Sequence, residues 1–175
     1  MGSRQDEIER ARNERVIIVD DDNAVVGAAP RHEMRAKRLP HRATFILVFD
    51  SNGRILVQKR TDTKDVYPGY YDLAAGGVVT EGESYDESAI REAAEELGIH
   101  GVPLESQFDF YYEDPGNRCF GHVYSCVCDG PFTLQPEEVV RVEFAELSDV
   151  LDGRVAPLTP DTVEALRRYL QGPSR

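Results

Sequence analysis

The chain has 175 residues, 41% of them hydrophobic, which suffices for one buried core and leaves little room for a second domain. Asp and Glu number 32 against 20 Lys and Arg, and the net charge of -12 argues against a nucleic-acid partner or an anionic membrane surface. No apolar run approaches the ~20 residues that span a bilayer, and residues 1–16 lack an apolar signal segment. We therefore expect a cytoplasmic protein, and its three cysteines fit a reducing compartment better than a disulfide framework.

Residues 1–14 are polar and charged without a sustained apolar stripe, so we expect a flexible N-terminus or a short surface helix. No repeat, low-complexity tract or glycine-serine linker divides the rest of the chain. We therefore assign residues 15–171 to a single domain and residues 172–175 to a C-terminal tail.

The first predicted elements of this domain are a β-hairpin and a short helix. Residues 16–19 and 24–28 are β-prone runs, and residues 20–23 form the turn between them. Pro30 suits the first turn of a helix that we expect to reach residue 38. This helix carries the densest basic cluster in the chain: Arg31, Arg35, Lys37 and Arg38. The cluster is either a solvated helix face or a phosphate contact.

A central hairpin follows. Residues 41–49 form a long apolar strand, residues 51–53 a turn and residues 54–60 a second strand. The polar loop at 61–69 carries Lys64, which together with Arg60 is placed to reach an anionic ligand. Residues 70–73 then form a short strand that leads into a pair of glycines, Gly76 and Gly77.

Residues 76–99 concentrate acidic side chains around one cation, Arg91. Ser84 and Glu87 form a capping box and Gly98 is a helix-ending residue, so we predict a helix over 85–97. At about 100° per residue, one face carries Glu92, Glu95 and Glu96, and the opposite face carries Ile90, Ala93, Ala94 and Leu97. A solvated acidic helix is the simpler explanation of a charge run, but three carboxylates behind a glycine loop favour a metal site.

The loop before this helix completes the predicted site. Its glycines allow it to fold back, so that Glu83 and the carbonyl of Gly76 or Gly77 approach the carboxylates. Arg91 lies one turn before Glu95, the spacing at which helical side chains touch. We therefore expect Arg91 to orient the carboxylates rather than to compete for the metal.

The second half of the domain is predicted as strands closed by a helix. The strands are residues 108–113, 118–128 and 139–145, with a turn at 114–117, and a helical turn at 147–151 precedes a final helix over 159–170. His122, Cys126 and Cys128 share one strand face, which suggests either a zinc site or ordinary buried cysteines. The order of elements predicts an α+β fold with a mixed sheet, an N-terminal hairpin and a helix on each face.

The acidic stretch resembles the Nudix box. The residues that match its fixed positions are Gly77, Glu83, Arg91, Glu92, Glu95, Glu96, Gly98 and Ile99. The resemblance implies an α/β/α sandwich and a pyrophosphohydrolase acting on a nucleoside diphosphate linked to another moiety, or on a similar small diphosphate. It also implies that Glu92, Glu95 and Glu96, with Arg91, act in catalysis and hold Mg²⁺ or Mn²⁺, assisted by Gly77 and Glu83.

Residues 41–84 are also similar to type I isopentenyl-diphosphate isomerases and to the Nudix hydrolases nearest to them. In those isomerases, a His at the place of His41 binds metal, and basic residues at the places of Arg60 and Lys64 contact the diphosphate. The resemblance thus makes these residues candidates for substrate binding. A histidine that is hydrogen-bonded locally at the entry of a strand is the alternative for His41.

The residues that carry out proton transfer in the isomerases are absent at the matching positions of this chain. The catalytic Cys and a metal-binding His of the isomerases correspond to Gly76 and Val78 here, and neither side chain can move a proton. We therefore expect a hydrolase, with a prenyl-diphosphate isomerase-like enzyme and a non-catalytic nucleotide-binding module as alternatives. A homodimer is compatible with the sequence. Acidic candidates for a catalytic group outside the box are Glu113, Glu137, Glu138 and Glu143.

Overall fold

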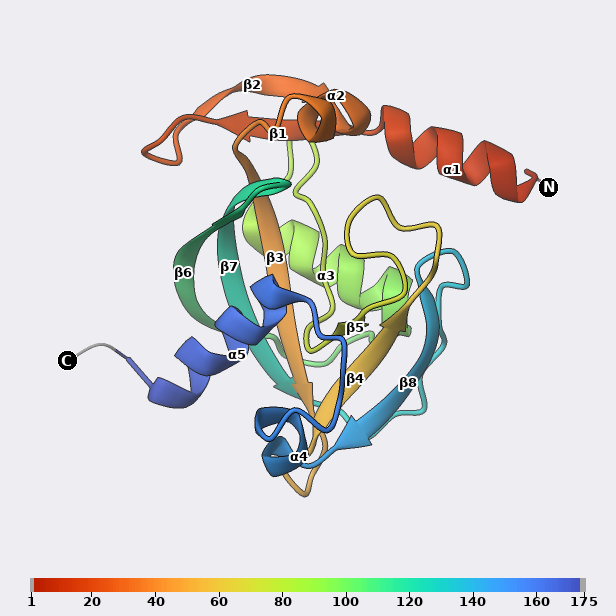
Figure 1. The fold of residues 1–175 in the computed structure, drawn as a ribbon, viewed down its shortest axis with the longest axis vertical. Helices are drawn as coiled ribbons and strands as arrows, with labels where there is room; N and C mark the ends of the chain where they lie inside the picture. Colours follow the sequence, from red (N-terminus) through yellow and green to blue (C-terminus); the bar gives the residue numbers. More distant parts are fainter. Residues whose placement is uncertain (1, 174–175) are drawn as a thin grey trace.

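The structure is a computed structural model that describes residues 2–173, and a mixed β-sheet forms its centre (Figure 1). Among these residues eight strands join one sheet, in which β2, β1, β3, β4 and β5 lie in that order. In addition, β7 pairs with β3 and β6, and β8 pairs with β4. The strands are β1 (Arg15–Val19), β2 (Val25–Pro30), β3 (His41–Phe49), β4 (Ile55–Arg60), β5 (Tyr71–Asp72), β6 (Glu105–Asp114), β7 (Asn117–Val127) and β8 (Val139–Ala145).

The sheet opens between β3 and β4, and this opening places the functional site. The two strands pair at Phe49 and Ile55 and then diverge, β3 toward its parallel partner β7 and β4 toward antiparallel β8 (Figure 1). The segment after β5 enters the opening, where Ala75 and Val78 form bridges with β3. Gly76 and Gly77 thus lie in the gap of the sheet.

One helix covers each face of the sheet, as predicted. The helices of the described chain are α1 (Arg4–Asn13), α2 (Arg31–Ala36), α3 (Tyr85–Leu97), α4 (Leu147–Leu151) and α5 (Pro160–Gln171). Successive residues of β3 face opposite sides: Ile46 packs with Ala89 and Leu97 of α3, and Leu47 packs with Leu166 of α5. Figure 1 shows α3 behind the sheet and α5 in front of it. The α+β sandwich with an N-terminal hairpin is confirmed.

Helix α3 has the predicted bounds, but one of its packing residues was assigned wrongly. Both bonds of the Ser84–Glu87 capping box are present, and Gly98 ends the helix at φ 67. Ile90, however, is 63% exposed. The buried stripe runs through Ala89, Ala93 and Leu97, residues spaced four apart, so Ile90 lies about 100° beyond it toward solvent.

Helices α1 and α5 lie near the two ends of the described chain, and α1 is the short surface helix that the sequence allowed as one alternative. Residues 4–13 of the N-terminal segment form helix α1, which begins with its own Ser3 capping box and buries no residue. Thr159 occupies the N-cap position of α5 without capping it, because its hydroxyl donates to Asp72 Oδ1 at 2.7 Å. The domain limits at 15 and 171 remain predictions. No helix within residues 2–173 is long and apolar enough to cross a membrane.

Candidate active site

The glycine loop and helix α3 form the first part of the site, and their close approach depends on glycine. Gly76 has φ 133, and a Cβ there would clash with the Thr44 carbonyl oxygen of β3. A Cβ on Gly77 would lie 2.6 Å from Glu92 Oε1. The Gly76 N–H donates to Glu96 Oε2 at 3.3 Å. We call the space bounded by this loop and by Glu92, Glu95 and Glu96 the carboxylate cup.

Arg91 holds the carboxylates from the side, as the sequence predicted. Its Nε donates to Glu83 at 2.8 Å, and its Nη1 donates to Glu92 at 3.0 Å and to Glu95 at 3.1 Å. Glu83 also accepts the backbone N–H of Thr80. Arg91 therefore fixes three of the four predicted glutamates and forms no ion pair with Glu96 within the described chain.

The deepest carboxylates of the cup are short of positive charge. Glu96 is only 7% exposed, and burial together with the nearby Glu92 raises its pKa well above the ordinary value. Burial raises the pKa of Glu92 to about 7, although Arg91 and Arg31 act in the opposite direction. Two acidic groups in such an environment favour either a shared proton or a bound cation.

The donor set of the cup fits Mg²⁺ or Mn²⁺, which both prefer oxygen ligands. Among residues 2–173 no group of three or more His, Cys, Asp or Glu side chains is already arranged to hold a metal ion. Ion binding therefore requires the carboxylates of the cup to move closer together. The Gly77 carbonyl accepts the Thr44 N–H at 2.9 Å and faces β3. The Gly76 carbonyl, the other predicted ligand, has no hydrogen bond within the described chain.

One of the four acidic candidates outside the box lines the cup. It is Glu138, which forms an ion pair with Lys64. Both residues line the cavity of about 360 Å³ that the cup forms. Glu113 instead contacts Arg38 and Arg118 on another surface. Arg10 and Glu14, from α1 and its end, also border the cup, and no local pattern points to them because their polar segment resembles any solvated helix.

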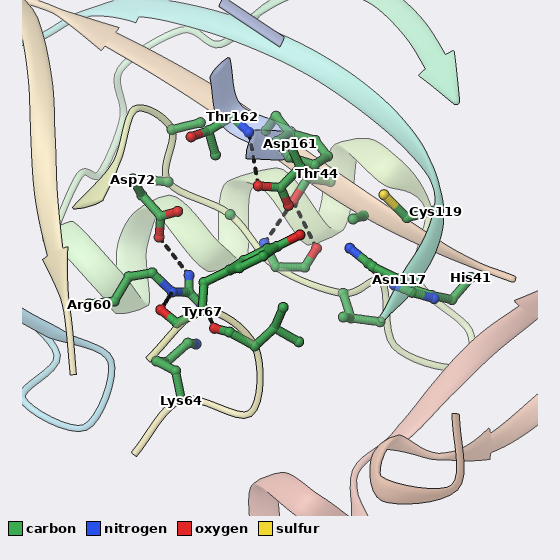
Figure 2. A pocket seen from close by; sticks show the side chains of 18 of the residues that line it. His41, Thr44, Arg60, Lys64, Tyr67, Asp72, Asn117, Cys119, Asp161 and Thr162 are labelled. Carbon is green, nitrogen blue, oxygen red and sulfur yellow. Dashed lines mark hydrogen bonds and ion pairs between the residues drawn. The ribbon is translucent and has the colours of Figure 1, made fainter. Parts of the chain in front are cut away.

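A second cavity of about 80 Å³ adjoins the cup and shares Arg31, Lys64, Gly76 and Gly77 with it; we call it the inner pocket (Figure 2). Its wall comes from α2, β3, β7, the 60–67 loop and the start of α5. Figure 2 shows Arg60, Lys64 and Asp72 on one side and His41, Asn117 and Cys119 on the other. The pocket therefore unites segments that are distant in sequence.

Of the two basic residues predicted to bind the diphosphate, Lys64 lines both cavities and Arg60 lines the inner pocket, and each has an internal partner. Arg60 donates to Asp72 at 2.6 Å, and Lys64 pairs with Glu138. The basic cluster of α2 divides: Arg31 and Arg35 turn inward and share Asp65, at 2.9 and 3.1 Å. Lys37, by contrast, pairs with Glu33 and its side chain is 63% exposed. Arg31 and Arg35 thus face the site, Lys37 is solvated, and Arg38 donates to the Asp114 carbonyl away from the cup.

His41 combines the two interpretations that the sequence left open. Its Nδ1 is 2.9 Å from the Leu39 carbonyl, so it is hydrogen-bonded locally, yet its ring lines the inner pocket. Burial and the nearby Arg35 lower the pKa of His41 to about 3, which keeps the ring neutral. Three further residues of the pocket, Asn117, Cys119 and Asp161, were missed because nothing in their local sequence distinguishes them.

A family comparison agrees with the fold and the box. The NUDIX domain family matches residues 39–169, so the chain belongs to this family. It is similar to a Nudix hydrolase of Yersinia pestis, with 50% identity over 155 residues that cover 89% of this chain and 85% of that protein. It is 47% identical over 161 residues to the Nudix hydrolase YfcD of Escherichia coli K12, with 92% and 89% of the two chains covered.

Solved structures show the same architecture. The crystal structure of DR0079 from Deinococcus radiodurans has a TM-score of 0.74 at 26% identity and covers 89% of this chain and 98% of that one. The NUDIX domain of Shewanella oneidensis NrtR, solved with ADP-ribose, has a TM-score of 0.60 at 17% identity, with 75% and 86% covered, and supports the fold alone. The protein is therefore a Nudix hydrolase, a pyrophosphohydrolase that cleaves a diphosphate-containing compound.

Proposed function

We propose that the protein hydrolyses a nucleoside diphosphate linked to another moiety, or a similar small diphosphate, with Mg²⁺ or Mn²⁺ held in the carboxylate cup. The observation that carries this proposal is a pair of neighbouring acids, the buried Glu96 and the mostly buried Glu92, beneath a glycine loop and beside inward-facing basic residues. Burying two neighbouring acids costs free energy unless a cation or a proton compensates them. A structural role alone would not explain the pair.

The bound ions would neutralise phosphate oxygens and activate water. Glu95, Glu96, Glu92 and the Gly76 carbonyl are the proposed ligands, and Glu83 supports them through Arg91. Glu92 is the proposed ligand or general base, because its carboxylate lies in the cup beside the backbone of Gly77 and is held by Arg91. Lys64, Arg60 and Arg31 would hold the diphosphate, which would replace Glu138 as the partner of Lys64.

The test is a product-resolved screen of diphosphate compounds with Mg²⁺ or Mn²⁺, followed by Glu96→Gln. We expect this variant to keep the fold and to lose about 100-fold or more in kcat, because one metal ligand is removed. Saturating Mg²⁺ should also stabilise the wild type, by about 2.7 kcal/mol at 100 times its Kd, and stabilise the variant less.

Glu105→Gln is the matched control, since Glu105 is an exposed glutamate at the start of β6, away from the cup. It should leave both the turnover and the Mg²⁺-dependent stabilisation unchanged. Wild-type turnover in Glu96→Gln would remove Glu96 from the site.

A second candidate function, prenyl-diphosphate isomerisation, is favoured by one observation. Cys119 of β7 lies opposite His41 of β3 and lines the inner pocket together with Gly76 and Val78, the positions where the isomerases carry their Cys and His. A thiol is thus present in the pocket, although it comes from another strand. Burial raises the pKa of Cys119 well above its usual range, so the thiol stays protonated.

A further inference from the structure

Three polar atoms in the inner pocket have no hydrogen-bond partner. Asn117 is 5% exposed, and its Oδ1 accepts from Arg35 at 3.2 Å while its Nδ2 donates to nothing in the described chain. His41 is 2% exposed, and its Nε2 is equally without a partner. Asp161 uses Oδ1 to accept the Thr162 N–H at 2.9 Å and leaves Oδ2 free.

These atoms are open to the pocket rather than sealed in the protein. Within residues 2–173, Ser88 Oγ is the one fully buried side-chain nitrogen or oxygen without a partner. The three side chains all line the inner pocket and come from β3, β7 and the start of α5 (Figure 2). The partner of each free atom must therefore be something that enters the pocket, either a ligand or water.

The three atoms define a specific pattern. His41 Nδ1 donates to the Leu39 carbonyl, so Nε2 of the neutral ring carries a lone pair and is an acceptor. Asn117 Nδ2 is a donor, and the Asp161 carboxylate is an acceptor. Acceptors and a donor around one small space suit hydroxyl groups, because each hydroxyl both donates and accepts.

Other ligand classes fit this pattern poorly. A prenyl chain would leave all three atoms without partners, and sites built from buried polar groups reject such analogues strongly. A further phosphate group would meet the Asp161 carboxylate, and the basic residues that line the pocket are already paired with Asp65, Asp72 and Glu138. The cavity of about 80 Å³ holds several water-sized groups at roughly 10–15 Å³ each, enough for a compact polyol.

We propose that the inner pocket binds a hydroxylated group, such as a sugar, that the substrate carries on its diphosphate, through Asp161, Asn117 and His41. The inference rests on the proposed function and specifies its second moiety. The pocket and the carboxylate cup meet at Arg31, Lys64, Gly76 and Gly77. A diphosphate at this junction would therefore have its hydroxylated end in the pocket and its scissile bond over the cup.

The test compares ADP-ribose, ADP and isopentenyl diphosphate as substrates and, by calorimetry, as ligands. We expect the highest kcat/KM and the tightest binding with ADP-ribose, whose terminal ribose the other two compounds lack. Asp161→Ala and Asn117→Ser should each raise KM for ADP-ribose up to about tenfold, the loss of one hydrogen bond, with kcat changed less. Neither variant should raise KM for isopentenyl diphosphate. Asp161→Asn, which retains an acceptor, should recover part of the loss.

Glu164→Gln is the matched control, because Glu164 lies one turn further along α5 and pairs with Arg167 and Arg168 outside the pocket. Equal kcat/KM and equal affinity for ADP-ribose and ADP would overturn the inference, because the terminal sugar would then contribute nothing in the pocket. A preference for isopentenyl diphosphate, or an unchanged KM in both folded variants, would overturn it as well. If no compound is hydrolysed, the proposed function fails, and the calorimetric comparison still decides whether the pocket binds the sugar.

Discussion

At the scale of single residues, the carboxylate of Asp161 lies in an environment that disfavours its ionised form. Burial and the nearby Asp72 raise the pKa of Asp161 to about 6, although Arg60 lowers it. Asp72 itself is paired with Arg60 and Thr159, so Asp161 has no cation of its own among these neighbours. An acid kept without a counterion reduces stability, and function is the usual reason why a protein tolerates such a group.

This environment predicts that Asp161→Asn stabilises the free protein at neutral pH. A folded-state pKa above the unfolded value makes ionisation costly: the cost is absent below pH 3.8, grows as pH rises, and is complete above about pH 6. The rise from 3.8 to about 6 corresponds to roughly 3 kcal/mol at most. Urea unfolding should therefore show the variant to be more stable at pH 7.5 and to lose this advantage near pH 4.

Asp65→Asn provides a control of opposite sign. Burial acts to raise the pKa of Asp65, but Arg31 and Arg35 outweigh it and hold that pKa far below its ordinary range. The ionised group therefore stabilises the fold above its unfolded pKa, and the asparagine variant should be less stable than wild type at pH 7.5. A stability difference for Asp161→Asn that does not change with pH would contradict the assigned environment.

At the scale of elements, the glycine loop and α3 depend on local rules, and these rules made them predictable. The capping box, the terminal glycine and the carboxylate spacing are all readable within residues 76–99. The exposure of Ile90 could not be predicted in this way, because the rotation of α3 about its axis is set by contacts with Ile46 and Leu56 of distant strands. The helical period fixes the angle between successive side chains, whereas packing decides which of these side chains face the sheet.

The same elements predict a strong effect of Gly76→Ala. The new Cβ would meet the carbonyl of Thr44, with its carbon only 2.8 Å away, and φ 133 is unfavourable for alanine. We expect a loss of about 2–4 kcal/mol from overpacking and backbone strain, measured by urea unfolding. Gly27→Ala is the control: no atom lies within 4 Å of its Cβ position, so its stability should change by about 0.5 kcal/mol at most. Equal stability of the two variants would mean that the loop does not require glycine.

At the scale of the whole molecule, the topology assembles a pocket that the sequence could not reveal. The parallel pairing of β3 with β7 places Cys119 opposite His41, and the crossover to α5 brings in Asp161. Arg60 and Lys64 were predictable from their loop and from the family resemblance. Their carboxylate partners Asp72 and Glu138 were not, because ion pairs between distant segments leave no local pattern.

This assembly also decides what we expect of the isomerase alternative. Isomerising a prenyl diphosphate requires an acid and a base poised over carbon. Cys119 is the sole thiol lining the inner pocket within residues 2–173; it is held protonated, and no side chain there forms a hydrogen bond with it that would relay its proton. The neutral His41 is anchored to Leu39 at its other nitrogen.

We therefore predict no conversion of isopentenyl diphosphate to its isomer and no deuterium in the prenyl chain after incubation in heavy water with Mg²⁺, as measured by mass spectrometry. Hydrolysis of a diphosphate in the same preparation is the control that the enzyme and its metal are active. Metal-dependent uptake of label would show that the pocket carries proton transfer to carbon. In that case Cys119→Ser should abolish the label while leaving hydrolysis intact, because Cys119 faces the inner pocket and does not border the carboxylate cup.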